Sequence, residues 1–286
     1  MGVTTWHDLQ FPGDATDFFA RTPLPPFEPE ASGYNTGNAL WLAELSRLVY
    51  RRDVEEDGPA PQPSRTSFLA RAGMRQRRFF NSFDTDTQAM LVEPISGPAF
   101  AVLVFRGTEQ KTRDYLTDLE LGTLWLTGNK KGIHEGFAEA LNSVWGSISM
   151  ELSRLACPVF FTGHSLGGAL ATLAAARRAP KALYTFGSPR VGNAAFAASL
   201  AATPVYRVVD DEDIITTVPP EALGFRHAGA EQRLTAPRQN ASYLDRLLNP
   251  PKFLADHALV NYVDRIAAHH SSPPASPERH RLAQAN

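Results

Sequence analysis

Residues 158–176 read PVFFTGHSLGGALATLAAA, and this stretch decides the fold. It is the only long segment without Asp, Glu, Lys or Arg, and it approaches the length of a membrane-spanning helix. His164, Ser165 and three glycines in its middle argue against a span. A short apolar run, a glycine-flanked serine and a run of small residues are instead typical of a strand, a tight turn and a helix in succession.

The turn has the pattern Gly-x-Ser-x-Gly, formed by Gly163, Ser165 and Gly167. A serine on such a turn needs neighbours without Cβ atoms, because the strand and helix backbones approach each other closely. The turn lifts the hydroxyl above the sheet at the helix N-terminus, where a nucleophilic serine is found. The alternative is a serine that merely caps a helix. A phosphate-binding loop is excluded, because Ala169 stands where that loop requires lysine.

An alternation of strand and helix patterns extends outward from this turn. The apolar run at residues 99–105 is nearly unbroken, as in a strand buried on both faces. Such an alternation predicts an α/β protein with a parallel or mixed sheet and helices on both faces, which binds ligands at the carboxyl ends of its strands. The predicted strands are 78–83, 87–93, 99–105, 159–162, 183–186 and 205–209, and the predicted helices are 38–50, 138–155, 166–178, 193–200 and 258–266.

The two ends of the chain differ in composition from its centre. Residues 1–35 contain five prolines, which favour an extended arm lying over the domain. Residues 271–286 are polar and contain prolines, which is typical of a disordered tail. Between them there is no repeat at a fixed period. We therefore expect one catalytic domain at residues 36–270, preceded by a Pro-rich arm and followed by a tail.

A neutral serine is a weak nucleophile, so Ser165 needs a base, and the base needs an acid that orients it. The strand predicted at 205–209 is followed by Asp210, Asp211, Glu212 and Asp213, four carboxylates at the edge of the sheet where the acid belongs. The alternative is that these residues form a solvated acidic loop. Most of the four are expected to be solvated in this way whichever one of them orients the base.

Five histidines follow these carboxylates. His269 and His270 end a predicted helix, where histidine often serves only as a favourable cation, and His280 lies in the tail. His257 directly precedes the helix predicted at 258–266, so it lies on a loop that can turn toward the sheet edge. We therefore favour His257 over His227 as the base.

Seven segments occur in a fixed order over residues 84–264. They are DTQA at 86–89, VFRGT at 104–108, DYLTDL at 114–119, IHEGF at 133–137, GHSLGGA at 163–169, YTFGSPRVGN at 184–193 and DH at 256–257. This set resembles the class 3 lipases, the fungal-type triacylglycerol lipase family, which has relatives in plants and bacteria. The resemblance implies an α/β-hydrolase fold, with a mostly parallel central sheet and helices on both faces.

Carried over residue by residue, the resemblance makes Ser165 the nucleophile, Asp213 the acid and His257 the base. In the family the acid usually follows an Asn by three residues and precedes Ile-Val-Pro. Here Asp210 stands at the first of these places, and Ile-Ile-Thr at 214–216 stands at the second. This departure leaves Asp210 and Asp211 as alternatives for the acid.

The resemblance also implies an oxyanion hole and a lid. The oxyanion hole consists of Thr108 and the backbone N–H of Leu166, which follow two strands on the same edge of the sheet. Thr108 as a plain turn residue is the alternative. The lid helix lies at residues 113–119, where Arg113, Tyr115 and Leu116 cover the serine. A core-packing helix is the alternative for residues 119–126.

These residues predict a serine hydrolase that cleaves carboxylic esters of lipids, a triacylglycerol lipase or esterase acting through an acyl-enzyme on Ser165. A phospholipase A-type or other carboxylesterase activity on the same site is the alternative. A lipase-like binding protein without turnover is a second class, because a fold does not entail a function. The presence of serine, acid, histidine and oxyanion threonine together argues against that class.

Composition restricts the possible partners. Lys and Arg number 28 against 30 Asp and Glu, so a net charge of −2 provides no field for binding nucleic acid. The expected partner is a lipid or other ester substrate, which can lie at a lipid–water interface, and no transmembrane segment is expected. No metal site is expected, because Ala138 replaces the second histidine of the metalloprotease motif that His134 would begin. No cofactor is expected either.

Two features concern the cellular compartment. Cys157 is the only cysteine, so no intramolecular disulfide can form. The N-terminus lacks a basic start followed by an apolar core, so no signal peptide is recognised. The compartment of this soluble protein stays open, with the cytoplasm and export without a leader as the two possibilities.

Overall fold

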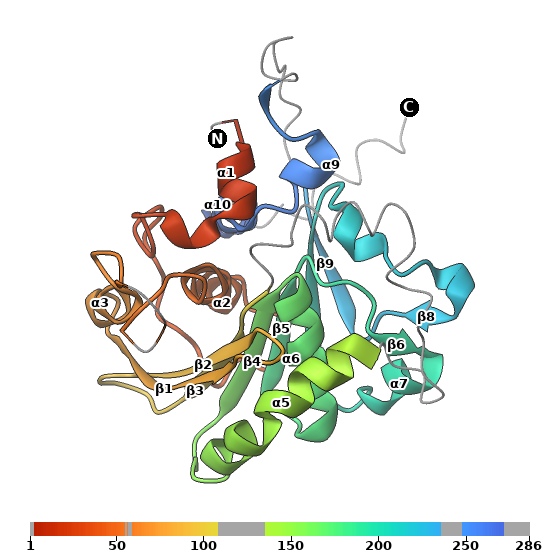
Figure 1. Cartoon of the computed structure of the whole chain (residues 1–286), viewed down its shortest axis with the longest axis horizontal. Coiled ribbons are helices and arrows are strands. Elements are labelled where there is room, and N and C mark those ends of the chain that lie inside the picture. Colours follow the sequence, from red (N-terminus) through yellow and green to blue (C-terminus); the bar gives the residue numbers. More distant parts are fainter. Residues whose placement is uncertain (1–2, 55, 57–58, 108–134, 236–247, 272–286) are drawn as a thin grey trace, which may run out of the picture.

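A seven-stranded sheet runs through the centre of the computed structural model, which describes residues 3–54, 56, 59–107, 135–235 and 248–271 (Figure 1). The strand order is β1-β2-β3-β4-β5-β7-β9. Strand β2 is antiparallel to both of its neighbours, β1 and β3, whereas β3, β4, β5, β7 and β9 are parallel to one another. The bounds are β1 Met74–Ser82, β2 Thr87–Pro94, β3 Ala101–Phe105, β4 Val159–His164, β5 Ala182–Phe186, β7 Val205–Asp210 and β9 Ala230–Leu234.

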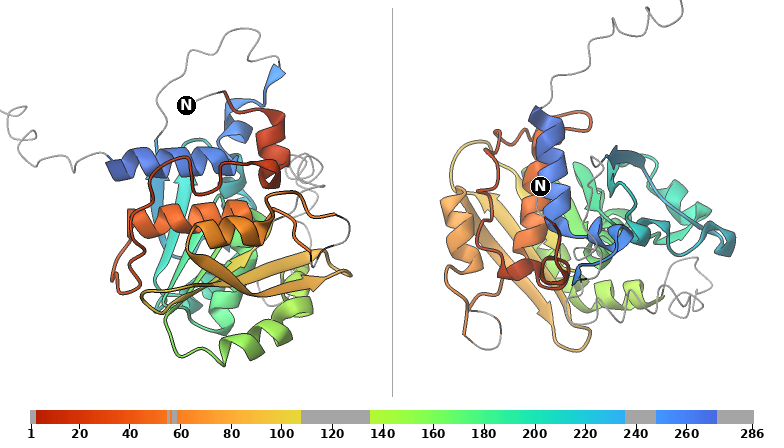
Figure 2. Two further views of the ribbon diagram at one scale, coloured as in Figure 1. Left: turned by 90° about the vertical axis from the view of Figure 1, so that its left-hand side faces the viewer. Right: turned by 90° about the horizontal axis from the view of Figure 1, so that it is seen from above.

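Helices cover both faces of this sheet, as the two further views also show (Figure 2). One face carries α2 (Thr36–Leu48), α3 (Arg65–Arg71) and α10 (Leu259–Ser271), and the other carries α5 (Glu135–Leu152), α6 (Leu166–Arg177) and α7 (Ala194–Ser199). Strand β3 shows why two cores form. Val102 and Val104 pack in the core beneath α2, α3 and α10, and Leu103 and Phe105 pack in the core beneath α5, α6 and α7. Successive side chains of a strand point to opposite faces of the sheet. The predicted sheet with helices on both faces is confirmed.

Short elements complete the described chain. They are α1 (Trp6–Gln10), α9 (Lys252–Ala255), the 3-10 turns η1 (Pro12–Asp14), η3 (Ile214–Thr217) and η4 (Glu221–Leu223), and an antiparallel pair, β6 (Gly192–Asn193) and β8 (Phe225–Arg226). None of the helices in the described ranges is long and apolar enough to cross a membrane.

The N-terminal segment packs on the domain, but it is not extended throughout. Thr5 and Asp8 form a capping box that begins α1, and Leu9 is buried. Farther along, Arg21 forms an ion pair with Asp264 of α10, with 2.7 Å between nitrogen and oxygen. The division into an arm, a catalytic domain and a tail stays a prediction, and residues 272–286 lie outside the described residues.

Candidate active site

Ser165 occupies a strained turn between β4 and α6. Its backbone angles are φ 55° and ψ −127°, in a region that residues with a side chain rarely adopt. The Ser165 amide donates to the carbonyl of Phe186 at 3.0 Å, which ties the turn to the end of β5. A Cβ atom at Gly163 would lie 2.4 Å from the backbone of Gly167, so only glycine permits the chain to turn this tightly. The predicted strand–turn–helix is present.

Asp213 lies in the turn after β7, where it is almost fully buried. Its backbone N–H donates to the carbonyl of Asp210 at 2.8 Å. Its carboxylate accepts hydrogen bonds from the amide of Ile215 at 2.9 Å and from the hydroxyl of Tyr262 at 2.5 Å. These donors hold the carboxylate in one orientation.

His257 lies between α9 and α10 and faces this carboxylate. Its Nδ1 atom is 2.9 and 3.0 Å from the two carboxylate oxygens of Asp213, so the ring donates from Nδ1. The Nε2 atom is buried and has no hydrogen-bond partner among the described residues. With Nδ1 protonated, Nε2 carries the lone pair that a general base requires. Asp213 and His257 therefore form an oriented acid–base pair.

A second histidine, His164, positions the backbone of the first. Its Nε2 donates to the carbonyl of His257 at 2.8 Å, and the two ring centres lie 4.4 Å apart. Complete burial, together with the neighbouring His257, holds the pKa of His164 well below its usual range. His164 is therefore a neutral donor, a role that the sequence analysis did not assign to it.

Gly187 allows the acid, the base and the end of β5 to pack together. Its φ is 58°, and a Cβ atom there would lie 2.6 Å from Oδ2 of Asp213 and 2.9 Å from Nδ1 of His257. A side chain at this position would enter the hydrogen bond between the two residues. Gly187 is part of the segment YTFGSPRVGN, but the sequence pattern alone does not explain why a glycine is required at this position.

The structure describes one half of the expected oxyanion hole. Leu166 is the first residue of α6, and a helix leaves its first amides without an acceptor of its own. Phe105 of β3 pairs with Gly163 of β4 in parallel register, so the chain that leaves β3 passes beside the serine turn. Thr108 itself lies outside the described residues, as do the predicted lid residues Arg113, Tyr115 and Leu116.

The alternatives for the acid have other partners. Asp210 is fully buried and forms an ion pair with Nη1 of Arg265. Asp211 accepts from Nζ of Lys252 at 2.6 Å. Of the three aspartates, the structure brings Asp213 to His257.

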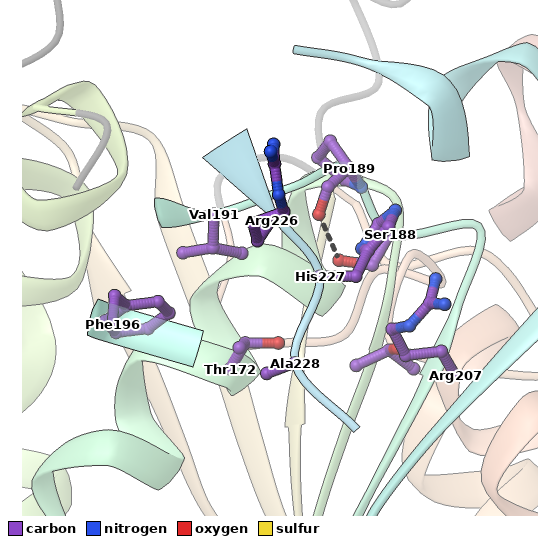
Figure 3. A pocket seen from close by; sticks show the side chains of 10 residues that line it. Thr172, Ser188, Pro189, Val191, Phe196, Arg207, Arg226, His227 and Ala228 are labelled. Carbon is purple, nitrogen blue, oxygen red and sulfur yellow. Dashed lines mark hydrogen bonds between the residues drawn. The ribbon is translucent and has the colours of Figure 1, made fainter. Parts of the chain in front are cut away.

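His227, the alternative for the base, has a different partner. His227 donates from Nε2 to the carbonyl of Thr216 at 2.7 Å, and burial, followed by the charge of Arg207, lowers the pKa of His227 to about 4. It lines a cavity of about 10 Å³, which has room for a single water molecule (Figure 3). His269 and His270 lie exposed in the last turn of α10, and His280 is outside the described residues. Within the described ranges no three His, Cys, Asp or Glu side chains are grouped to hold a metal ion.

The chain is similar in sequence to known lipases. The family model described as lipase (class 3) matches residues 102–223. A secreted mono- and diacylglycerol lipase of Fusarium solani is 43% identical over 111 residues, which are 35% of this chain and 33% of the relative. A chloroplastic phospholipase A(1) of Arabidopsis thaliana is 36% identical over 155 residues, 44% of this chain and 35% of the relative. The chain thus matches about a third of the length of these curated relatives.

A solved structure extends the similarity over more of the fold. The triacylglyceride lipase of Rhizomucor miehei is 30% identical in sequence, with a TM-score of 0.50. The match covers 57% of this chain and 67% of that lipase.

Proposed function

Because the chain belongs to the class 3 lipase family, we propose that it is a serine hydrolase that cleaves the carboxylic esters of lipids through an acyl-enzyme on Ser165. Its mostly parallel sheet with helices on both faces is the α/β-hydrolase fold. In this proposal Asp213 is the acid and His257 the base, and Leu166 and Thr108 supply the oxyanion hole.

In the proposed mechanism, Oγ of Ser165 attacks the ester carbonyl carbon while Nε2 of His257 takes the hydroxyl proton. Asp213 keeps the ring in the tautomer with Nδ1 protonated, and its negative charge stabilises the imidazolium that forms. The amide of Leu166 and Thr108 bind the oxyanion. The intermediate collapses to the acyl-enzyme as the imidazolium gives its proton to the leaving alcohol. Water then attacks the acyl group with the same proton transfers, which frees the fatty acid and Ser165.

The pairing of Asp213 with His257, 2.9 Å apart and next to a strained serine turn, is the observation that supports this proposal best. The three residues come from separate chain segments, each at the carboxyl end of a strand or at the start of a helix. His164, which directly precedes Ser165, donates to the carbonyl of His257 at 2.8 Å, so the serine turn lies beside the pair. A serine that only caps a helix needs no oriented acid–base pair beside it.

A fluorophosphonate probe tests the nucleophile directly. The unmutated protein should be labelled at Ser165, and labelling and ester turnover should both vanish in Ser165→Ala. The control is Ser46→Ala, which removes a buried serine of α2 whose hydroxyl lies 3.2 Å from that of Thr162. It should keep labelling. An unmutated protein that binds lipid but is neither labelled nor active would favour a binding protein without turnover.

Two classes of lipid ester are candidate substrates, neutral glycerides and phospholipids. One relative is a mono- and diacylglycerol lipase, and another is a phospholipase A(1). Fatty acid release from triacylglycerol, diacylglycerol and phosphatidylcholine should therefore be compared at equal acyl chain length. A series of p-nitrophenyl esters then measures the preferred chain length. We propose neutral glycerides as the preferred substrates, and faster release from phosphatidylcholine would favour the phospholipase.

The lid also belongs to the proposal. Tyr115 and Leu116 in a helix over the serine would bury their apolar faces when the site is closed and contact lipid when it is open. The rate should then rise abruptly when a medium-chain ester passes from monomers to aggregates. Replacing both residues with serine should flatten the rise and spare a soluble short-chain ester. A smooth hyperbola for the unmutated protein would contradict the lid.

The compartment in which the enzyme acts stays a prediction. The sequence-based expectation is cytoplasm or export without a leader, whereas the relative from Fusarium solani is secreted. Antibody detection of the protein in culture medium and in cell lysate distinguishes these possibilities.

A further inference from the structure

A buried ionic cluster connects the turn that carries Asp213 with the turn that carries His257. Its centre is Asp256, which directly precedes His257 and is almost fully buried. The carboxylate of Asp256 accepts from the backbone N–H of Glu212 at 3.1 Å and from Nζ of Lys252 at 2.6 Å. Residues 210–213 are here called the acid turn, and residues 252–257 the base turn.

Arg265 of α10 joins both turns with one guanidinium group. Its Nη2 donates to Oδ1 of Asp256 in the base turn at 2.8 Å, and its Nη1 forms an ion pair with Asp210 in the acid turn. A guanidinium can do this because its donors lie in a rigid plane, whereas an ammonium is a single point of charge. The bridge thus connects the residue before His257 with the residue three positions before Asp213.

The bridge formed by Arg265 differs from the ion pairs on the protein surface because its three side chains are buried. The Arg265 side chain is 8% exposed, that of Asp256 2%, and that of Asp210 is fully buried. Burial raises the pKa of Asp210 to about 7, although Arg265 opposes the shift. Lys252, the other cation of the cluster, is 45% exposed, so water screens its contacts. Arg265 is therefore the cation on which the geometry of the two buried carboxylates depends.

The other contacts around Arg265 do less to join the two turns. The Tyr262 hydroxyl accepts from the backbone N–H of Asp210 at 3.1 Å and donates to Asp213, so it organises the acid turn alone. The contact between Asp256 and Glu212 connects the turns through a single backbone amide. Lys252 of the base turn reaches Asp211 of the acid turn at 2.6 Å, but from its solvent-screened position.

We propose that Arg265 is a positioning residue, which holds the acid turn and the base turn together and so keeps Asp213 within hydrogen-bonding distance of His257. This inference rests on the proposed function of the Asp213–His257 pair. Arg265 contacts neither the serine nor the expected ester. It acts through Asp210 and Asp256, one in each turn.

The experiment compares Arg265→Gln and Arg265→Lys with a matched control. Asp264→Asn removes the ion pair between Arg21 and the neighbouring residue of the same helix, which lies outside the cluster. Three properties are measured: kcat and KM for a soluble short-chain ester per fluorophosphonate-titrated site, the melting temperature, and the low-field proton NMR resonance of the His257 Nδ1 hydrogen. The resonance reports on the Asp213–His257 hydrogen bond and does not require turnover.

Arg265→Gln should lower kcat per titrated site by about 10- to 100-fold, because a displacement of about 1 Å between reacting groups has effects of this size. KM should change by less than about threefold, since the substrate contacts are intact. The Nδ1 resonance should shift or broaden. Arg265→Lys, which keeps the charge and can reach one carboxylate at a time, should give intermediate values of kcat and of the shift. Asp264→Asn should match the unmutated protein.

A merely stabilising role makes a different prediction. It lowers the melting temperature and leaves kcat per titrated site and the resonance unchanged, and that result in Arg265→Gln would overturn the proposal. If Arg265→Gln does not fold, Arg265→Lys decides, and the proposal is wrong if this variant matches the unmutated protein in both properties. Failure of the proposed function is separate: the unmutated protein would then be neither labelled nor active, while the resonance would still test the bridge.

Discussion

Replacing Gly187 with alanine should disrupt the hydrogen bond between Asp213 and His257 without mutating either residue. The new Cβ would lie 2.6 Å from Oδ2 of Asp213 and 2.9 Å from Nδ1 of His257, and ordinary contacts begin at 3.4 Å. The carboxylate must therefore retreat by about 0.8 Å and the ring by about 0.5 Å. Since a misplacement of about 1 Å can reduce a rate by roughly 10²-fold, kcat should fall by about 10- to 100-fold.

Backbone strain contributes a second, separable effect. Gly187 has a φ of 58°, where a residue with a Cβ atom is less stable by about 1–2 kcal/mol. Gly224, at the end of η4, has a φ of 86°, and a Cβ atom there would have no neighbour within 4 Å. Gly224→Ala therefore introduces comparable strain without the steric contact, and it serves as the matched control.

The assay measures kcat for a soluble short-chain ester per fluorophosphonate-titrated site, together with urea unfolding of all three proteins. Gly224→Ala should lose stability and keep kcat, whereas Gly187→Ala should lose both. Full kcat in Gly187→Ala would refute the reasoning, because the hydrogen bond between Asp213 and His257 would then tolerate the displacement. An equal loss of kcat in both variants would attribute the effect to backbone strain.

Three further predictions concern single polar groups. Thr108→Val removes a proposed oxyanion donor and should lower kcat for a soluble ester by roughly 10²- to 10³-fold; an unchanged kcat would leave this residue at most its backbone amide in the hole. Tyr262→Phe leaves the buried amide of Asp210 without its acceptor at 3.1 Å and should lower the free energy of unfolding by about 1–3 kcal/mol, and identical urea midpoints would contradict this. Burial raises the pKa of Asp210 from 3.8 to about 7, so the native state holds an extra proton between these values, and the stability that this group contributes is lost as the pH rises through about 7. Asp210→Asn should therefore lose less stability than the unmutated protein between about pH 5 and pH 7.5 in urea unfolding, and equal losses would show that Asp210 does not titrate in this range.

Local patterns predicted the parts of the fold that depend on local chemistry. The glycines around Ser165 and the apolar run of β3 identify their elements because close packing and burial on both faces restrict composition. Strand β9 was missed because its residues, AEQRL, are mostly exposed, and a strand at the edge of a sheet needs no apolar alternation. Helix α1 was missed because five residues ahead of Pro12 are too few to show a helical period, although its capping box was readable.

The pairings within the site depend on long-range geometry that no local pattern contains. Tyr262 and Arg265 read as ordinary positions of the helix that follows His257, one apolar and one polar, and only the packing of α10 against the end of β7 brings them to the aspartates. His164 likewise reads as part of the serine motif until its contact with the His257 carbonyl is seen.

The choice among the aspartates shows what the structure adds. Asp210 and Asp213 are three residues apart and equally buried, so neither composition nor exposure separates them. Their partners do. Above about pH 7, where Asp210 is ionised, Arg265 compensates its charge. The hydrogen bonds to Asp213 come instead from a neutral tyrosine, a backbone amide and the imidazole of His257. A carboxylate paired with a guanidinium has less attraction left for a developing imidazolium, because the cation beside it repels the new charge. The departure from the family pattern at Asp210 thus adds a carboxylate that a cation of this chain neutralises, and it leaves the negative charge of Asp213 available to His257.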